Sequence, residues 1–170
     1  AFKQYGLDWN WTKREYSSLL SKSGGKDRIS RYAKKNKKIV NSVYLRNLKT
    51  KIFNNYLKKN QLKLRPGVKN LILFCKKEKI RLAFVSSTSS NNINAILYSL
   101  RNSINKKDFS FVGNSRLVNK FKPNPAIYLL ALKKLKLKAN DCVAIEDTQE
   151  SLNSARRARI KCIIFPGKFH

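Results

Sequence analysis

The chain has 170 residues and a formal net charge of +29, because 38 Lys and Arg face only 9 Asp and Glu. Its hydrophobic content of 42% and aromatic content of 11% exclude a disordered basic tail, which would be poor in both. No apolar run approaches the ~18 residues that a membrane-spanning helix needs, so we expect a folded chain with no membrane partner.

The first third of the chain is predicted to be helical. Apolar residues recur there at helical spacing, which predicts helices over residues 11–20, 27–33 and 45–56. Pro66-Gly67 then forms a turn that opens another helix. We therefore expect residues 1–62 to form a small helical cap, with part of its flanking linker, and residues 63–170 to form the main domain.

Short apolar segments alternate with helical segments after residue 66. The predicted strands cover residues 82–85, 109–112, 142–145 and 162–165, and a helix begins at Pro123. Such alternation is typical of an α/β fold, a parallel sheet with helices on its faces.

The cysteines and the histidine limit the possible chemistry. One histidine and three cysteines without a Cys-x-x-Cys pair argue against a zinc site or a histidine-based triad. Cys142 and Cys162 fall in strand-like runs and are predicted to be buried, reduced thiols. Reduced thiols suit a reducing compartment, which is the cytoplasm, or the plastid stroma if the source organism has plastids.

Hydroxyl groups and a lysine are predicted at the carboxyl ends of the strands, where ligands bind in parallel sheets. Ser86, Ser87 and Thr88 follow the first strand, and Lys122 precedes the helix between the second and third strands. Hydroxyls beside helix-start N–H groups suit a phosphate, and a lysine adds a point charge. Alternatively, the hydroxyls of residues 86–90 only cap a helix, and Lys122 is one of many surface lysines.

Two adjacent acids, Glu146 and Asp147, end the third strand. Paired carboxylates suit a hard cation such as Mg²⁺, which binds oxygen ligands and bridges to phosphate. Asp147 or Thr148 alternatively caps the helix that follows. An acid at the end of an apolar strand, as Glu146 is, needs a partner or a metal.

Taken in order, these residues resemble the haloacid dehalogenase (HAD) superfamily of phosphatases and phosphomutases. Ser86 after an apolar strand is similar to the second family motif, Lys122 in Lys-Pro-Asn-Pro-Ala-Ile-Tyr to the third, and Ile145-Glu146-Asp147-Thr148 to the fourth. The stretches 6–11 and 24–29 resemble the CbbY proteins, which share a small helical cap with β-phosphoglucomutase.

The resemblance implies a HAD-like Rossmannoid parallel sheet with a helical cap, and a Mg²⁺-dependent phosphatase of a phosphorylated sugar such as xylulose 1,5-bisphosphate. The alternatives are a phosphosugar mutase of the β-phosphoglucomutase type or a non-catalytic basic protein that binds nucleic acid. The implied roles are phosphate binding by Ser86, Ser87 and Lys122, substrate contact by Thr88 and by Lys26 of the cap, and Mg²⁺ binding by Glu146 and Asp147, with Asp147 as the direct ligand.

The first family motif, Asp-x-Asp-Gly-Thr, is absent from the sequence, since no two of the nine acids stand two residues apart. The family places this motif, with its nucleophilic aspartate, on the central strand of the sheet. We therefore expect the strands near Leu82 and Cys142 to flank a position with no strand. The chain is then expected to be a fragment, or to be inactive by itself.

The positive charge alone suggests a polyanion as partner. However, the basic residues are spread along the whole chain, and no predicted helix has a continuous basic face with aromatic residues between. A nucleic-acid partner is therefore not expected, and the charge is interpreted as a lysine-rich surface.

Overall fold

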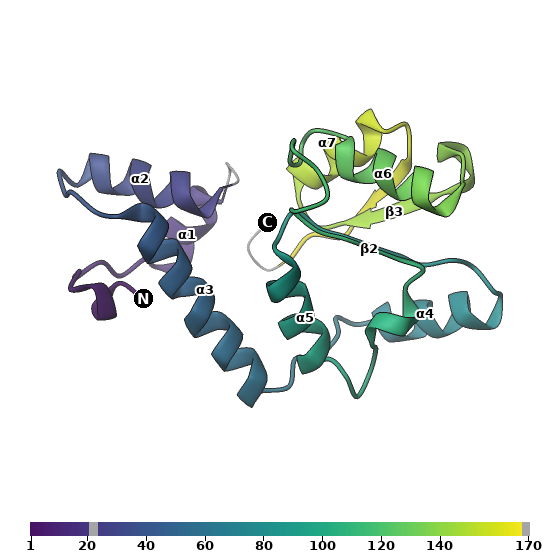
Figure 1. The fold of residues 1–170 in the computed structure, drawn as a ribbon, viewed down its shortest axis with the longest axis horizontal. Coiled ribbons are helices and arrows are strands. Elements are labelled where there is room, and N and C mark those ends of the chain that lie inside the picture. Colours follow the sequence, from purple (N-terminus) through teal and green to yellow (C-terminus); the bar gives the residue numbers. More distant parts are fainter. Residues whose placement is uncertain (21–23, 168–170) are drawn as a thin grey trace. The chain divides into compact units, whose positions relative to one another are not determined.

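The computed structural model describes residues 1–20 and 24–167, and Figure 1 traces its elements along the chain. Its contacts divide the chain after Tyr56, into a first unit of residues 1–56 and a second unit of residues 57–167. The sequence placed the boundary between the cap and the main domain after residue 62. That the two units act as a cap and a main domain stays a prediction. Among the described residues, no helix is both long and apolar enough to span a bilayer.

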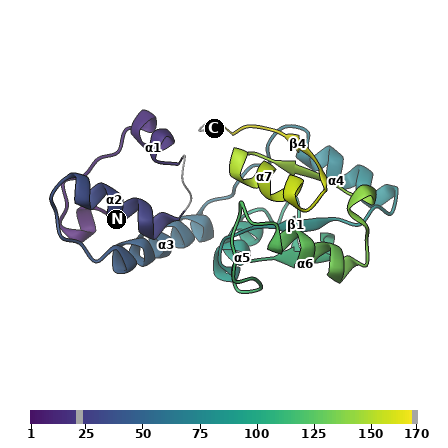
Figure 2. The same cartoon turned by 90° about the horizontal axis from the view of Figure 1, so that it is seen from above.

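The described residues of the first unit form helices and no strands (Figure 2), namely η1 (Lys3–Tyr5), α1 (Lys13–Leu19), α2 (Gly25–Lys35) and the greater part of α3 (Ser42–Lys59). A capping box fixes the start of α1, because Thr12 Oγ1 accepts from Glu15 N at 3.2 Å and Glu15 Oε2 accepts from Thr12 N at 2.8 Å. The predicted helix therefore begins two residues later than expected.

The second unit has an α/β architecture. Its elements in chain order are α4 (Val68–Lys77), β1 (Ala83–Val85), α5 (Ser90–Ser99), η2 (Lys106–Asp108), β2 (Phe111–Gly113), α6 (Ala126–Leu135), η3 (Ala139–Asp141), β3 (Val143–Glu146), α7 (Gln149–Arg157) and β4 (Lys161–Ile164). The predicted alternation of strands and helices is confirmed.

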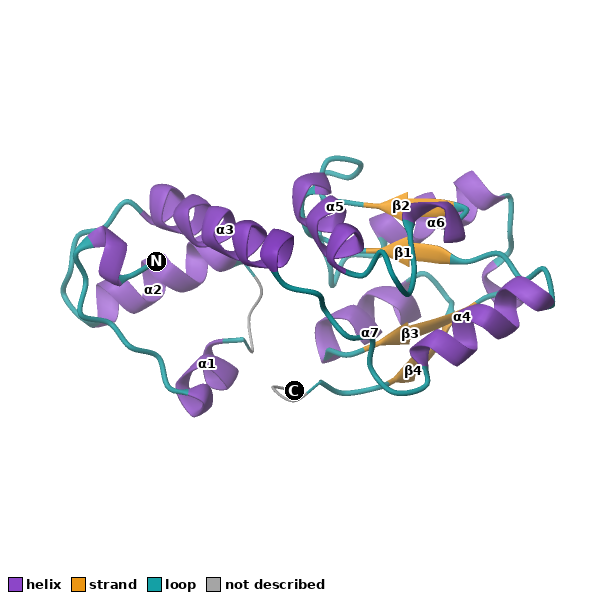
Figure 3. Cartoon of the chain, turned by 90° about the horizontal axis from the view of Figure 1, so that it is seen from below, coloured by secondary structure: helices purple, strands orange, loops and turns teal. Residues whose placement is uncertain are grey.

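The four strands form two separate parallel pairs, as Figure 3 shows. Ala83 of β1 lies opposite Phe111 of β2, and Val143 of β3 lies opposite Lys161 of β4. Among the described residues, β1 pairs only with β2 and β3 pairs only with β4. Each strand thus has one edge without a strand partner among the described residues, and this includes β1 and β3, the two strands expected to flank an empty position.

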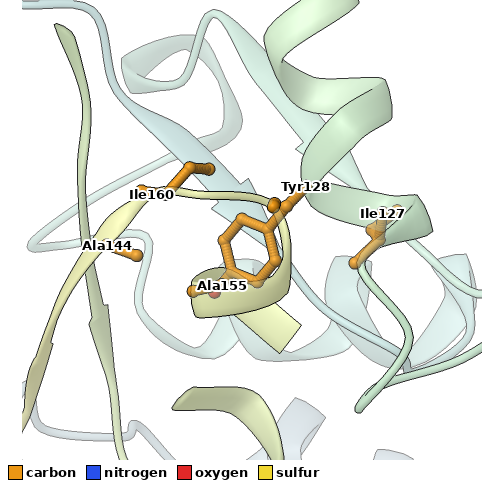
Figure 4. Packing of buried hydrophobic residues seen from close by; sticks show 6 residues of the cluster. Ile127, Tyr128, Ala144, Ala155 and Ile160 are labelled. Carbon is orange, nitrogen blue, oxygen red and sulfur yellow. The ribbon is translucent and has the colours of Figure 1, made fainter. Parts of the chain in front are cut away.

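One hydrophobic cluster joins α6 and α7 to β3 and β4. It contains Ile127, Tyr128, Ala144, Ala155 and Ile160 (Figure 4). Strand side chains alternate between faces, so Ala144 is buried here while the neighbouring Val143 and Ile145 are 59% and 49% exposed on the other face. A second cluster packs α4 and α5 against β1 and β2 through Ile72, Ile93, Leu97, Leu100 and Ile104.

Ile127 provides a test of the first cluster, because its side chain is 1% exposed. We expect Ile127→Ala to lower the free energy of unfolding by about 2–5 kcal/mol, through lost burial and the cavity left behind. Leu129 on the same helix is 49% exposed, so Leu129→Ala should cost less than about 1 kcal/mol. Urea unfolding measures both, and equal losses would contradict this account of the packing.

The second strand begins two residues later than predicted, at Phe111. A short 3₁₀ turn precedes it, held by a capping box in which Asn105 Oδ1 accepts from Lys107 N at 3.1 Å and Asp108 Oδ2 accepts from Asn105 N at 2.9 Å. Asp108 also binds Lys76 Nζ at 2.7 Å. Phe109 N donates to the Lys106 carbonyl at 3.2 Å, so Phe109 belongs to the end of this turn and not to the strand.

The Lys76 ammonium, together with the Asn105 N–H, holds the pKa of Asp108 below its ordinary value. A carboxyl with a lowered pKa stabilises the fold above its unfolded pKa and loses that contribution as the pH falls through its folded pKa. Asp108→Asn should therefore be less stable than the parent at about pH 7, and the gap should close near pH 2. Urea unfolding at both pH values checks this, and a gap that does not change with pH would contradict it.

The cysteines are less buried than predicted. Cys75 is buried, whereas Cys142 and Cys162 are only half-buried and all three are free. Cys142 precedes β3, and Cys162 lies in β4. Burial, followed by nearby acids, raises the pKa of both thiols. The reducing compartment stays a prediction.

Candidate functional site

Lys122 joins the ends of the two strand pairs. Its side chain is 8% exposed, and its Nζ lies 2.5 Å from Glu146 Oε1, where the Glu146 side chain is 11% exposed. The same Nζ donates to the Val85 carbonyl at 3.3 Å and to Ser151 Oγ at 3.4 Å. A nearly buried ion pair therefore brings the carboxyl ends of β1 and β3 to one place.

Two residues that the sequence reasoning missed complete this cluster. The Tyr128 hydroxyl donates to Glu146 Oε1, and Ser151 accepts from Lys122. Burial, followed by the charge of Glu146, raises the pKa of Tyr128, so its hydroxyl keeps its proton. Tyr128 closes the Lys-Pro-Asn-Pro-Ala-Ile-Tyr stretch, which was the only signal that could have indicated it.

Among the hydroxyl residues after β1, the predicted site residues Ser86, Ser87 and Thr88 do not cap α5. Ser89 takes that role, since its Oγ accepts from Asn92 N at 3.3 Å. Ser86 Oγ instead accepts from Thr88 N at 3.2 Å, and Ser87 Oγ accepts from Lys122 N at 3.4 Å. In the part of the chain that the structure describes, neither hydroxyl donates a hydrogen bond, so both have a proton to offer to an anion.

Thr88 is positioned differently from the two serines before it. Its Oγ1 accepts from Asn92 Nδ2 at 2.9 Å, and its carbonyl accepts from Ser115 N at 2.8 Å. These contacts fix Thr88 to α5 and to the loop after β2. They leave the substrate role of Thr88 as a prediction.

Asp147 is the accessible acid of the site. Thr148 caps α7 by accepting from Ser151 N at 3.1 Å, so the capping alternative applies to Thr148 and not to Asp147. Asp147 is exposed, and no hydrogen bond or ion pair within residues 1–20 and 24–167 engages its carboxylate. It is thus available to a ligand, whereas Glu146 already binds Lys122 and Tyr128.

The donor set fits a magnesium ion that takes further ligands from its substrate. Among the described residues, no group of three or more His, Cys, Asp or Glu side chains is arranged to hold a metal. Mg²⁺ is commonly bound by one or two carboxylates together with waters and phosphate oxygens. Asp147 and Glu146 offer that number, and their role as ligands stays a prediction.

Lys26 belongs to the first unit. It lies in the first turn of α2 and is exposed. The preceding Gly24 has a φ of 95°, a backbone conformation that favours glycine. The role of Lys26 toward a substrate stays a prediction.

Comparison with known proteins supports a single assignment. The family model "Haloacid dehalogenase-like hydrolase" matches residues 1–165. The protein CbbY of Cereibacter sphaeroides is 33% identical over 170 residues, which cover 98% of this chain and 74% of that protein.

Solved structures give the same result. A crystal structure of a CbbY variant from Rhodobacter sphaeroides, in complex with xylulose-(1,5)bisphosphate, matches with a TM-score of 0.89 and 33% identity over 99% of this chain and 76% of that one. A putative β-phosphoglucomutase from Thermotoga maritima matches with a TM-score of 0.71 and 21% identity, over 98% and 77% of the two chains. The second match shows the shared fold alone.

Proposed function

The chain belongs to the haloacid dehalogenase-like hydrolases, as the order of its motifs predicted, and we propose that it is a Mg²⁺-dependent sugar-phosphate phosphatase. The observation that carries the proposal is the nearly buried Lys122–Glu146 pair at the meeting point of β1 and β3. Among the described residues, the Ser86 and Ser87 hydroxyls donate no hydrogen bond and the Asp147 carboxylate has no partner, a set that suits a phosphate and a hard cation.

The substrate that we propose is a sugar bisphosphate of the xylulose 1,5-bisphosphate type. A relative with 33% identity has been crystallised with that compound. A bisphosphate has a phosphate at each end, and each phosphate needs positively charged groups around it. This chain is rich in positively charged side chains, with 38 Lys and Arg. Lys26 is proposed to contact the phosphate that is not transferred, and Thr88 the sugar.

Each side chain has a separate task in the proposed reaction. Two of the three Lys122 contacts are long, at 3.3 and 3.4 Å, so a phosphate oxygen can replace them while the ion pair with Glu146 is kept. The Ser86 and Ser87 hydroxyls donate hydrogen bonds to oxygens of the same phosphate. Asp147 would hold Mg²⁺ with support from Glu146, and the ion would supply positive charge to the phosphoryl oxygens.

The nucleophile is proposed to come from a segment that is not among these 170 residues. No Asp-x-Asp pair occurs in the sequence, and β1 and β3 each pair on one edge only among the described residues. A strand that paired with both would end beside Lys122. An aspartate at its carboxyl end would then face the hydroxyls and Asp147.

The test is phosphate release by the chain joined at its N-terminus to a strand-forming segment that carries Asp-x-Asp-Gly-Thr. We expect release from xylulose 1,5-bisphosphate that needs Mg²⁺ and stops with a chelator. Conversion of a sugar 1-phosphate to its 6-phosphate, without release, would favour a mutase. If the joined chain is folded and catalyses neither reaction, the proposal is refuted.

A further inference from the structure

Lys and Arg side chains cluster at the end of the second unit that lies opposite the candidate site. In a parallel α/β unit, helices end and strands begin at one edge, and the candidate site lies at the other edge. Four segments reach this opposite edge, namely residues 76–81, 106–108, 133–141 and 159–161, and together we call them the basic edge. They contain three acids, Glu78, Asp108 and Asp141, and twelve exposed Lys and Arg: Lys76, Lys77, Lys79, Arg81, Lys106, Lys107, Lys133, Lys134, Lys136, Lys138, Arg159 and Lys161.

Contacts show that the segments are neighbours in space. Lys76 binds Asp108 at 2.7 Å, which joins the end of α4 to the turn before β2. Arg81 donates to the Leu135 carbonyl at 2.6 Å, which joins the start of β1 to the end of α6. Lys161 lies opposite Val143 where β4 and β3 begin. Figure 3 shows α5 and α7 near the other end of the strands.

Three of these cations occupy backbone positions that favour glycine. Lys79, Lys136 and Arg159 follow α4, α6 and α7 with φ of 55°, 52° and 60°. Glycine is the usual residue at such helix ends because a Cβ is disfavoured there. Basic residues at helix ends also interact favourably with the helix dipole, but that effect does not require the position with positive φ. The chain thus has charge where glycine would fit the backbone better.

We propose that the basic edge binds the phosphate backbone of double-helical nucleic acid without reading its sequence. The prediction against such a partner rested on the spread of basic residues along the chain, and folding brings twelve of them to one edge. These four segments contain no aromatic residue, so they offer no surface on which single-stranded bases stack. Ile80 is the one large apolar side chain there that is exposed, which is too little to insert into a membrane.

The test compares two variants that each lose three positive charges. The edge variant is Lys79→Gly/Lys136→Gly/Arg159→Gly, and the control is Lys34→Gln/Lys35→Gln/Lys37→Gly in the first unit, where Lys37 also has a positive φ of 50°. Binding is measured by fluorescence anisotropy with a mixed-sequence duplex of about 20 bp, in DNA and RNA forms, from about 50 to 200 mM salt. Vesicles containing phosphatidylserine are the second probe.

We expect the parent chain to bind either duplex with a Kd that rises steeply with salt. The edge variant should raise the Kd at least about tenfold and lower the slope of log K against log salt by about 2 to 3 units. Its melting temperature should be equal to or above that of the parent, because glycine relieves the positive φ. The control variant should shift the Kd by less than about twofold.

Four outcomes would overturn the proposal. These are no duplex binding at the lowest salt, equal weakening by both variants, an unchanged salt slope in the edge variant, or edge-dependent binding to vesicles but not to duplexes. None of them bears on phosphate release, so the proposed phosphatase activity is tested separately.

Discussion

Lys122→Met is expected to lower the free energy of unfolding by about 3–5 kcal/mol, the usual cost of breaking a buried ion pair by removing one partner. Lys122 and Glu146 are 8% and 11% exposed, so water cannot replace the lost ammonium around the carboxylate. Methionine keeps a long unbranched side chain, and the effect therefore reports the charge and its hydrogen bonds. Urea unfolding with parallel fluorescence and circular dichroism measures it.

Two controls separate the ion pair from a general loss of charge. Lys120 is exposed, and Lys120→Met should change the stability by less than about 0.5 kcal/mol. The double variant Lys122→Met/Glu146→Gln should recover part of the loss, because a neutral amide costs less to bury than an unpaired carboxylate. If Lys122→Met unfolded at the same urea concentration as Lys120→Met, the Lys122–Glu146 pair would not hold the strand ends together.

Asp147→Asn is expected to reduce Mg²⁺-dependent phosphate release by about 100-fold or more, in the chain joined to the Asp-x-Asp segment. Asp147 is exposed and has no partner among the described residues, so its loss should leave the stability within about 0.5 kcal/mol of the parent. A variant that folds normally and releases little phosphate would thus have lost a ligand and not a structural contact. The Mg²⁺ concentration for half-maximal rate should rise with the same substitution.

The matched control for Asp147 is Glu150, which lies in the first turn of α7. Glu150→Gln removes the same charge three residues away and should leave the rate and the Mg²⁺ dependence nearly unchanged. If both variants lost activity equally, the effect would be one of net charge near the site. If Asp147→Asn kept the parent rate, the metal assignment would be wrong.

The sequence predicted the alternation of strands and helices because short apolar runs and periodic helices are local patterns. It also predicted that Ser86, Lys122 and Glu146 would approach one another, since strand ends meet at one edge of a parallel sheet. It could not show which oxygen caps which helix. Ser89 and Thr148 take the caps, and only the backbone directions at each helix start decide that.

The contacts of the Glu146 side chain could not be predicted from the sequence. An acid at the end of an apolar strand indicated that a partner was needed, and the structure supplies Lys122 and the Tyr128 hydroxyl. Tyr128 and Ser151 lie on two different helices, α6 and α7, whose packing depends on the whole hydrophobic cluster around Ile127. Contacts of that kind come from tertiary packing and leave no periodic signal.

The clustering of positive charge at the basic edge likewise could not be predicted from the sequence. Basic residues that look dispersed in the sequence become neighbours at the basic edge, because four separate turns meet there. Lys79, Lys136 and Arg159 have no common sequence motif, and what they share is a positive φ at a helix end. These three residues lie at the same edge because the topology of the parallel α/β unit places the ends of their helices there.

The most direct test of the proposed phosphatase is the steady-state rate of phosphate release from xylulose 1,5-bisphosphate by the joined chain, with and without Mg²⁺. We expect a kcat/KM at least about tenfold above that for sugar monophosphates, and a loss of about 100-fold or more on chelation or with Asp147→Asn. A folded joined chain that released no phosphate from the bisphosphate, or released it equally well without Mg²⁺, would contradict the proposed function.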